Sequence, residues 1–447
     1  GETRRHTAFK FALSQACEGG GKRWYTSTLE LRLVSKEFCQ ACRGVPTLRV
    51  LVNHQTPPRL WSPPTKQHYD DSGRKSNDEE SVPAVRAVAL TWALPIEVLI
   101  QTAAIWRWTW LEDLQLDTHV TAASLESLVW PIRLKRLVVG HNFNEPIAGV
   151  VWPASLQQLS FGENFNQPID GFLWPASLQQ LSFGPSFNQS IAGAPSPAGL
   201  RQVSFGNKFN QPITDVLWPH YLRHLSFGLS FDQPIAGVVW PTSLQRLSFR
   251  GDFNQPIAGV VWPVSLQQLS FGGDFNQPIE NVEWPASLQW LSFRGAFNQP
   301  IAGVVWPTSL QWLSFGGDFN QPIAGVVWPV SLQQLWFRGA FNQPIAGVVW
   351  PTSLKRLSFG GDFNQPIENV EWPASLQWLS FENRFNQPIA EVVWPASLQQ
   401  LSFGEDFHQP TANVVWPASL RQVKQLWFDS QAGVGSRTIY NGRHSSP

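Results

Sequence analysis

The chain has 447 residues, with 32 lysines and arginines against 32 aspartates and glutamates, so its formal net charge is zero. This balance provides no basic field to hold a phosphate backbone, which argues against nucleic acid as a partner. Only 14% of the residues are charged, while 24 are tryptophan and 30 are phenylalanine, a clear departure from the about 25% charge of ordinary globular domains.

Residues 1–52 form a mixed N-terminal region that holds all three cysteines of the chain. So few cysteines argue against a disulfide framework and favour a reducing compartment, and no apolar run is long enough for a signal peptide, so we expect a cytoplasmic or nuclear location. Cys39 and Cys42 form a C-x-x-C motif, and His54 is the only further candidate ligand near it, which leaves a structural zinc site incomplete. We therefore expect no metal and no other cofactor.

Residues 53–82 combine Pro-Pro pairs, many charges and few large apolar groups, the composition of a disordered linker. Residues 83–129 then turn apolar, and we predict degenerate entry coils and an N-terminal cap there. The apolar stretch 87–111 contains Pro, Glu, Gln and Arg, which a bilayer span tolerates poorly, so a membrane helix is the weaker interpretation and we expect no membrane partner.

Residues 130–428 are a regular array, in which a Phe followed by Asn, Asp or His recurs thirteen times from Phe143 to Phe407. A Trp recurs in step with it, and Leu111, Leu114 and Leu116 echo the unit ahead of the array. One such coil buries too little surface to fold alone, whereas stacked coils share a continuous core. We predict a β-rich tandem-repeat solenoid of stacked 22-residue coils with mostly parallel strands. The polar residues 429–447 are expected to be a disordered tail.

Within one coil, the spacing L-x-x-L-x-F from Leu156 to Phe161 predicts a short strand. Leu159 and Phe161 should face the core, while Gln158 and Ser160 face the other side. Strict alternation would turn Leu156 outward, so we expect a bend before the strand. No stretch of the coil favours a helix of ten residues, because Gly and Pro interrupt it. The positions expected to return inward or close the coil are Val151, Trp152, Pro153, Phe165 and Ile169.

The segments FNQPI and WPASLQQLSFG resemble the unit of the FNIP repeat family, a group similar to leucine-rich repeats. The resemblance implies a solenoid of that type, with Trp at a position where the family commonly has Leu. Ser190 lacks the usual Pro, Ser196 lacks the Trp and Asp232 replaces an Asn. We therefore expect an irregular coil around residues 188–199.

FNIP arrays often follow an F-box, and residues Leu31 to Phe38 (LRLVSKEF) are similar to the late part of that domain. The usual Leu-Pro opening is absent, so an ordinary amphipathic helix is the favoured interpretation of the segment and an F-box remnant the alternative. If the segment is an F-box remnant, the resemblance implies a substrate receptor that docks a Skp-type adaptor of a cullin-RING ubiquitin ligase through Leu31–Phe38.

Strand positions that face away from the core are free to differ between copies, and they do. Most coils carry Gln at the position of Gln158 and Ser at that of Ser160, but several carry Trp or Arg, the residue types most enriched in binding hot spots. We therefore predict a non-catalytic scaffold that binds a protein partner on this face. The candidate residues are Arg246, Arg250, Trp290, Arg294, Trp312, Trp336, Arg338, Arg356 and Trp378.

Two alternatives use the same residues. The segment that starts at Gly272 recurs at Gly360, so Trp290 and Trp378 are also explained as copies from a duplication of four coils. A glycan-binding solenoid would use the exposed Trp side chains as stacking platforms.

The repeated Asn of each coil, such as Asn166, Asn254 and Asn342, is expected to bond turn backbone of the adjacent coil, because buried amides need partners. The chain contains no G-x-S-x-G and no P-loop, so nothing in the sequence indicates an enzyme.

Overall fold

A computed structural model of the chain describes residues 48–52, 88–92, 111–116, 119–429 and 433–441. The segments on which we based the F-box, the C-x-x-C motif and the linker therefore lie outside the described residues. Within the part described, no helix has both the length and the apolar character needed to cross a membrane.

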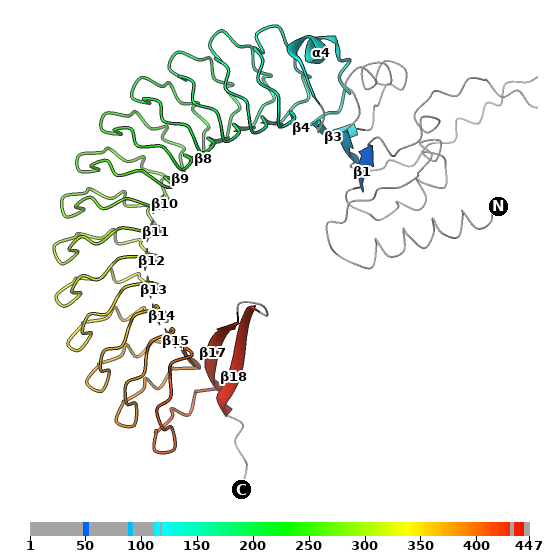
Figure 1. Cartoon of the computed structure of the whole chain (residues 1–447). Coiled ribbons are helices and arrows are strands. Elements are labelled where there is room, and N and C mark those ends of the chain that lie inside the picture. The colour runs from blue at the N-terminus through cyan, green and yellow to red at the C-terminus, as the bar shows by residue number, and fades with distance from the viewer. Residues whose placement is uncertain (1–47, 53–87, 93–110, 117–118, 430–432, 442–447) are drawn as a thin grey trace, which may run out of the picture. The chain divides into compact units, whose positions relative to one another are not determined.

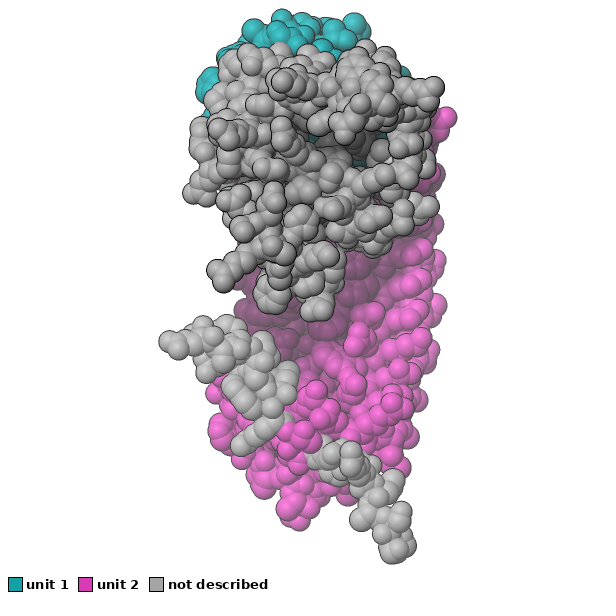
Figure 2. Space-filling view, turned by 90° about the vertical axis from the view of Figure 1, so that its right-hand side faces the viewer, with its two compact units in different colours: residues 1–189, 194–200 teal, residues 190–193, 201–447 magenta. Residues whose placement is uncertain are grey.

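The chain divides into two compact units, shown in Figure 2. Unit 1 comprises residues 1–189 and 194–200, and unit 2 comprises residues 190–193 and 201–447. The boundary thus falls within the coil in which Ser190 and Ser196 interrupt the repeat pattern.

In unit 1, each strand pairs in parallel with the next along the chain. Leu114 of the third strand lies opposite Leu137 of the fourth, as the sequence echo predicts. A short helix is capped by Thr121, whose side chain accepts a hydrogen bond from the backbone N–H of Ser124. The elements are β1 (Leu48–Val52), β2 (Val88–Trp92), β3 (Leu111–Leu116), α4 (Ala122–Ser127), β4 (Arg136–Val138), β5 (Gln158–Ser160) and β6 (Gln180–Ser182).

In unit 2, strands β7 to β17 form one parallel series, in which each residue lies opposite its equivalent in the next coil. Strands β8 to β15 line the inner edge of this unit and the loops form its outer edge (Figure 1). The strands are β7 (Gln202–Ser204), β8 (His224–Ser226), β9 (Arg246–Ser248), β10 (Gln268–Phe271), β11 (Trp290–Phe293), β12 (Trp312–Phe315), β13 (Gln334–Phe337), β14 (Arg356–Phe359), β15 (Trp378–Phe381), β16 (Gln400–Phe403), β17 (Gln422–Asp429) and β18 (Gly433–Asn441).

The core positions follow the predicted alternation. Leu159 and Phe161 are buried, whereas Gln158 and Ser160 remain half-buried on the opposite side. The expected bend is also present, because the backbone N–H of Leu156 donates to the carbonyl of Pro153 across a turn and brings this leucine inward. The structure is therefore a parallel-strand solenoid with almost no helix.

Aromatic rings form continuous columns through unit 2. Phe271 lies 5.6 Å from Phe293 of the next coil and 4.3 Å from Phe275 of its own coil, with the rings close to parallel in each pair. Trp284 meets Phe293 edge-on at 6.3 Å. Aromatic pairs of this kind contribute about 0.5–1.5 kcal/mol each beyond the area they bury, so each coil is stabilised by rings that belong to its neighbours.

One position of the unit differs from the sequence prediction. Val151, which we expected to help close its coil, is 80% exposed, while Val150 before it is buried. Trp152 and Pro153 do pack inward. The same exposed position recurs along unit 2 as a row of valines, Val239, Val261, Val305, Val327, Val349, Val393 and Val415.

The prediction of a disordered tail from 429 to 447 is wrong for residues 433–441. These residues form β18, which pairs antiparallel with β17. The segment GVGSRTIYN contains Val434, Thr438 and Ile439, which favour a strand. It also satisfies the open backbone edge that the last parallel strand would otherwise present.

The repeated Asn residues are structural, as predicted. The Oδ1 of Asn276 accepts from the backbone N–H of Asn298 at 2.9 Å and from Nε2 of Gln299 at 3.0 Å. Asp232 performs the same role in its coil, where its Oδ1 accepts from the N–H of Asn254 and from Gln255, both at 2.9 Å. An acceptor oxygen at this position, rather than an amide as such, is what the fold requires.

The substitution Asn276→Ala should therefore lower the free energy of unfolding by about 1–3 kcal/mol. It removes the acceptor of the Asn298 backbone N–H and leaves Nε2 of Gln299 with only the backbone carbonyl of residue 276. Urea unfolding followed by circular dichroism measures the effect. The matched variant Asn276→Asp keeps an acceptor oxygen and should unfold near the wild-type midpoint. An alanine variant as resistant to urea as the wild type would contradict this role.

Candidate interaction face on the strands of unit 2

All nine residues predicted to bind a partner lie in unit 2, on the strands or on the turn that follows each strand. The tryptophan side chains are half-buried, whereas the arginines are exposed. The face is thus neither a buried core nor a fully solvated surface. The structure separates its residues into two tryptophan clusters and three outlying arginines.

The first cluster is a stacked pair. Trp290 on β11 and Trp312 on β12 lie directly opposite each other, with ring centroids 4.4 Å apart and planes only 9° from parallel. The serines two positions on, Ser292 and Ser314, are buried, whereas the equivalent Ser270 beside them is half-buried. The two rings hold each other in place, so they form a rigid apolar platform.

The second cluster spans three strands. Trp336 on β13 and Trp378 on β15 approach to 5.2 Å between ring centroids, although β14 separates their strands. Ser358 of β14 lies opposite Trp336 in register and is fully buried. The guanidinium carbons of Arg338 and Arg356 lie 5.5 Å and 5.4 Å from the rings of Trp336 and Trp378. Each such cation–π contact contributes about 0.5–1 kcal/mol at an exposed site.

Glu382 belongs to this second cluster and was not anticipated from the sequence. It follows β15 at the turn position that Arg338 occupies two coils earlier. Burial raises the pKa of its carboxyl group, and nearby Arg338 and Ser358 only partly oppose the shift. A signal was present in the sequence, since Glu382 replaces the common Gly, but nothing there showed that its carboxyl group would be partly buried near Arg338 and Ser358.

Arg246, Arg250 and Arg294 lie outside both clusters. Arg246 is on β9, while the other two follow β9 and β11 in the turns. None of the three forms an ion pair with another residue in the part of the chain that the structure describes. Their charges are therefore available to a partner without breaking a contact of the fold.

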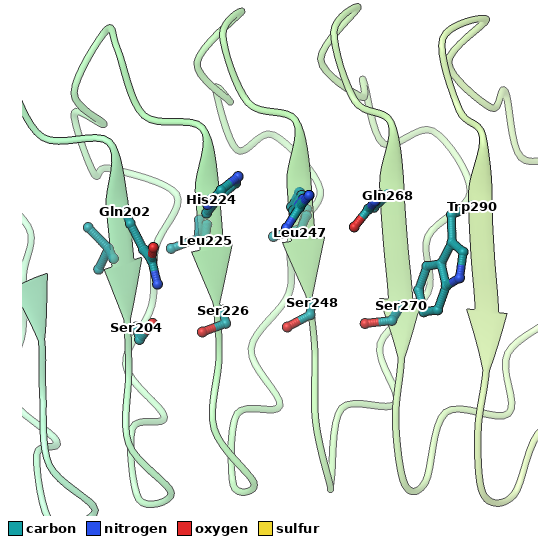
Figure 3. A pocket seen from close by; sticks show the side chains of 12 residues that line it. Gln202, Ser204, His224, Leu225, Ser226, Leu247, Ser248, Gln268, Ser270 and Trp290 are labelled. Carbon is teal, nitrogen blue, oxygen red and sulfur yellow. The ribbon is translucent and has the colours of Figure 1, made fainter. Parts of the chain in front are cut away.

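A groove of about 300 Å³ runs across β7 to β11 on the same face (Figure 3). Both Arg246 and Trp290, which we predicted from the sequence to belong to one site, line this groove. Burial, together with Arg246 and Arg223, lowers the pKa of His224 in the groove, so this imidazole is neutral near pH 7. The remaining lining residues are Gln202, Val203, Ser204, Leu225, Ser226, Leu247, Ser248, Gln268 and Ser270.

Over the described ranges, no three His, Cys, Asp or Glu side chains come together in a way that could hold a metal ion. The groove itself combines one arginine, one neutral histidine, hydroxyl and amide groups and one indole. This set can bind by hydrogen bonds, charge and stacking.

The FNIP repeat model matches residues 143–184, 209–252, 253–295, 297–339 and 341–384. The solved structure of CroV588, described as a novel circular LRR protein, shares 38% sequence identity over 77% of this chain, with a TM-score of 0.60. The match spans 56% of CroV588, little more than half its length.

Two further structures align less closely. They are an internalin (inlF) from Listeria monocytogenes, at 16% identity with a TM-score of 0.41, and the Toll–Spatzle complex of Drosophila, at 10% and 0.43. The internalin alignment covers 61% of this chain and 80% of the internalin chain. The Toll–Spatzle alignment covers 90% of this chain and 61% of the matched chain. A search of curated protein sequences found no match.

The raised pKa of Glu382 predicts a pH dependence of stability. Because the folded state binds this proton more tightly than the unfolded chain, whose Glu pKa is about 4.3, the stability that Glu382 contributes is present below about pH 4.3. That stability is lost as the pH rises through the raised folded pKa. The variant Glu382→Gln, which stays neutral, should therefore gain in melting temperature relative to the wild type as the pH increases.

Thermal unfolding from about pH 4 to pH 7 measures this difference. The same substitution at the exposed Glu405 is the control. A constant difference between wild type and Glu382→Gln over the whole range would show that the carboxyl group titrates at the same pH in both states.

Proposed function

Because the repeats of this chain belong to the FNIP family and stack as a solenoid similar to leucine-rich repeats, we propose that it is a non-catalytic scaffold that binds a protein partner on the strand face of unit 2. Stacked repeats of this kind present extended surfaces on which adjacent coils contribute side by side.

One observation carries the proposal: large residues stand at positions where the fold needs only small or polar ones. Gln and Ser occupy the same two positions in most coils, for example Gln268 and Ser270. Their replacement by Trp290, Trp312 and Trp336 keeps the register of the strands. The replacements therefore change the surface and leave the scaffold as it is.

The chemistry of the face favours a protein over a neutral ligand. Tryptophan and arginine carry a large share of the energy in protein interfaces, and Arg250 and Arg294 add charge that has no partner among the described residues. A glycan would use the indole rings but gain little from the arginines. The more specific role of ubiquitin-ligase substrate receptor rests on the resemblance of residues 31–38 alone.

The double variant Trp290→Gln/Trp312→Gln should weaken partner binding without loss of fold. Glutamine is the common residue at this strand position, so melting should stay within a few degrees of the wild type while affinity falls at least about tenfold. The tagged chain would be used to isolate its partner from its own cells, and calorimetry with the purified partner gives the affinity.

The control is Gln158→Ala/Gln180→Ala at the same strand position in unit 1, which should bind normally. Unchanged affinity in the tryptophan variant would contradict the proposal, and so would its failure to fold. Isolation with and without residues 1–45 separates partners of the solenoid from Skp and cullin components.

A further inference from the structure

The groove across β7 to β11 is cationic and contains no acidic side chain. Of its lining residues, Arg246 is charged, and no aspartate or glutamate is among them. Arg223 adds a second positive charge close to His224. An anionic group is therefore the charged ligand that this groove complements.

Trp290 closes one end of the groove with a flat apolar surface. One face of its ring is covered by Trp312 at 4.4 Å. The ring also lines the groove next to Ser270 (Figure 3), so it offers apolar surface on that side. Since the stacked partner fixes the indole, a ligand side chain that packs on it loses little affinity to ordering the ring.

The hydroxyl and amide groups between these two ends suit a peptide backbone. Ser226, Ser248 and Ser270 lie opposite one another on successive strands, so their hydroxyl groups follow one line along the groove. Gln202 and Gln268 add amide donors and acceptors. An extended segment that crosses the strands would find partners here for its own N–H and C=O groups.

The spacing between the charged and apolar ends limits the ligand further. Arg246 and Trp290 are two strands apart in register, which is about 10 Å at about 4.8 Å per strand. An extended chain in the polyproline II conformation advances about 3.1 Å per residue and completes a turn every three residues, so two side chains three residues apart face the same side at about this distance.

We propose that the groove binds an extended acidic segment of the protein partner. In this arrangement a carboxylate pairs with Arg246, and an apolar side chain three residues away packs on Trp290. The inference rests on the proposed function and assigns the chemistry of the partner at one end of the strand face. His224, Ser226 and Ser248, which the sequence did not single out as site residues, become part of the site.

The test uses fluorescein-labelled peptides with the core Glu-Gly-Ser-Phe-Gly-Ser-Glu, flanked by Gly-Ser. This core places a glutamate three residues from the phenylalanine in either chain direction. Fluorescence anisotropy should show binding about tenfold tighter than for two matched peptides, one with both Glu replaced by Gln and one with Phe replaced by Ser. Arg246→Gln should remove the preference for Glu over Gln, and Trp290→Gln the preference for Phe over Ser. Arg421→Gln, at an exposed position directly before β17, should keep both preferences.

Equal binding of the three peptides, or no binding of any, would overturn the proposal. Loss of the preference in Arg356→Gln but not in Arg246→Gln would also overturn it, by moving the acidic site to the second tryptophan cluster. Binding of cellohexaose in place of the peptides would identify a glycan platform instead. If the native partner still requires Trp290 and Trp312 while the peptides fail, the groove assignment is wrong but the proposed function stands.

Discussion

The fold depends on the stacking of each coil on an almost identical copy of itself. A 22-residue coil without a helix cannot enclose its own phenylalanines, so their faces are completed by the rings of the adjacent coils, as for Phe271 between Phe249 and Phe293. The polar contacts also join each coil to the next one, since the side-chain oxygen of Asn276 accepts a hydrogen bond from the backbone N–H of Asn298, its equivalent in the following coil. Both interactions require strict register, which explains why the inward positions of the copies scarcely change. Large side chains can vary only at positions facing away from the core, and unit 2 concentrates its variation on the strand face.

The two tryptophan clusters show how surroundings change the role of one substitution. Trp290 and Trp378 occupy equivalent positions in two copies of the same segment. Trp290 stacks on Trp312 and faces a groove, whereas Trp378 leans towards Trp336 over a buried serine and lies beside Arg356. A duplication explains how the second tryptophan arose. The different neighbours mean that the two copies offer different surfaces, one open and apolar, the other covered by cations.

Much of the coil could be predicted from the sequence, because alternation along a strand determines which side chains face the core. This applies to Leu159 and Phe161, and the Asn column followed from the need of buried amides for partners. Alternation does not show how far a side chain leans sideways, so the contact of Trp336 with Trp378 and the burial of Ser358 were not predictable. Glu382 was missed for the same reason. Val151 was misassigned because Val150 directly before it takes the buried position, and β18 was missed because a polar composition conceals a strand that closes the stack.

The claim that the strand face of unit 2 is the binding surface, and the outer loops are not, is tested most directly by hydroxyl-radical footprinting of the chain with and without its partner. We expect Trp290, Trp312, Trp336 and Trp378 to become protected from oxidation, while exposed valines outside the strands, such as Val261 and Val327, react as before. Protection of the valines with unchanged oxidation of the four tryptophans would contradict the claim and place the partner away from the strand face.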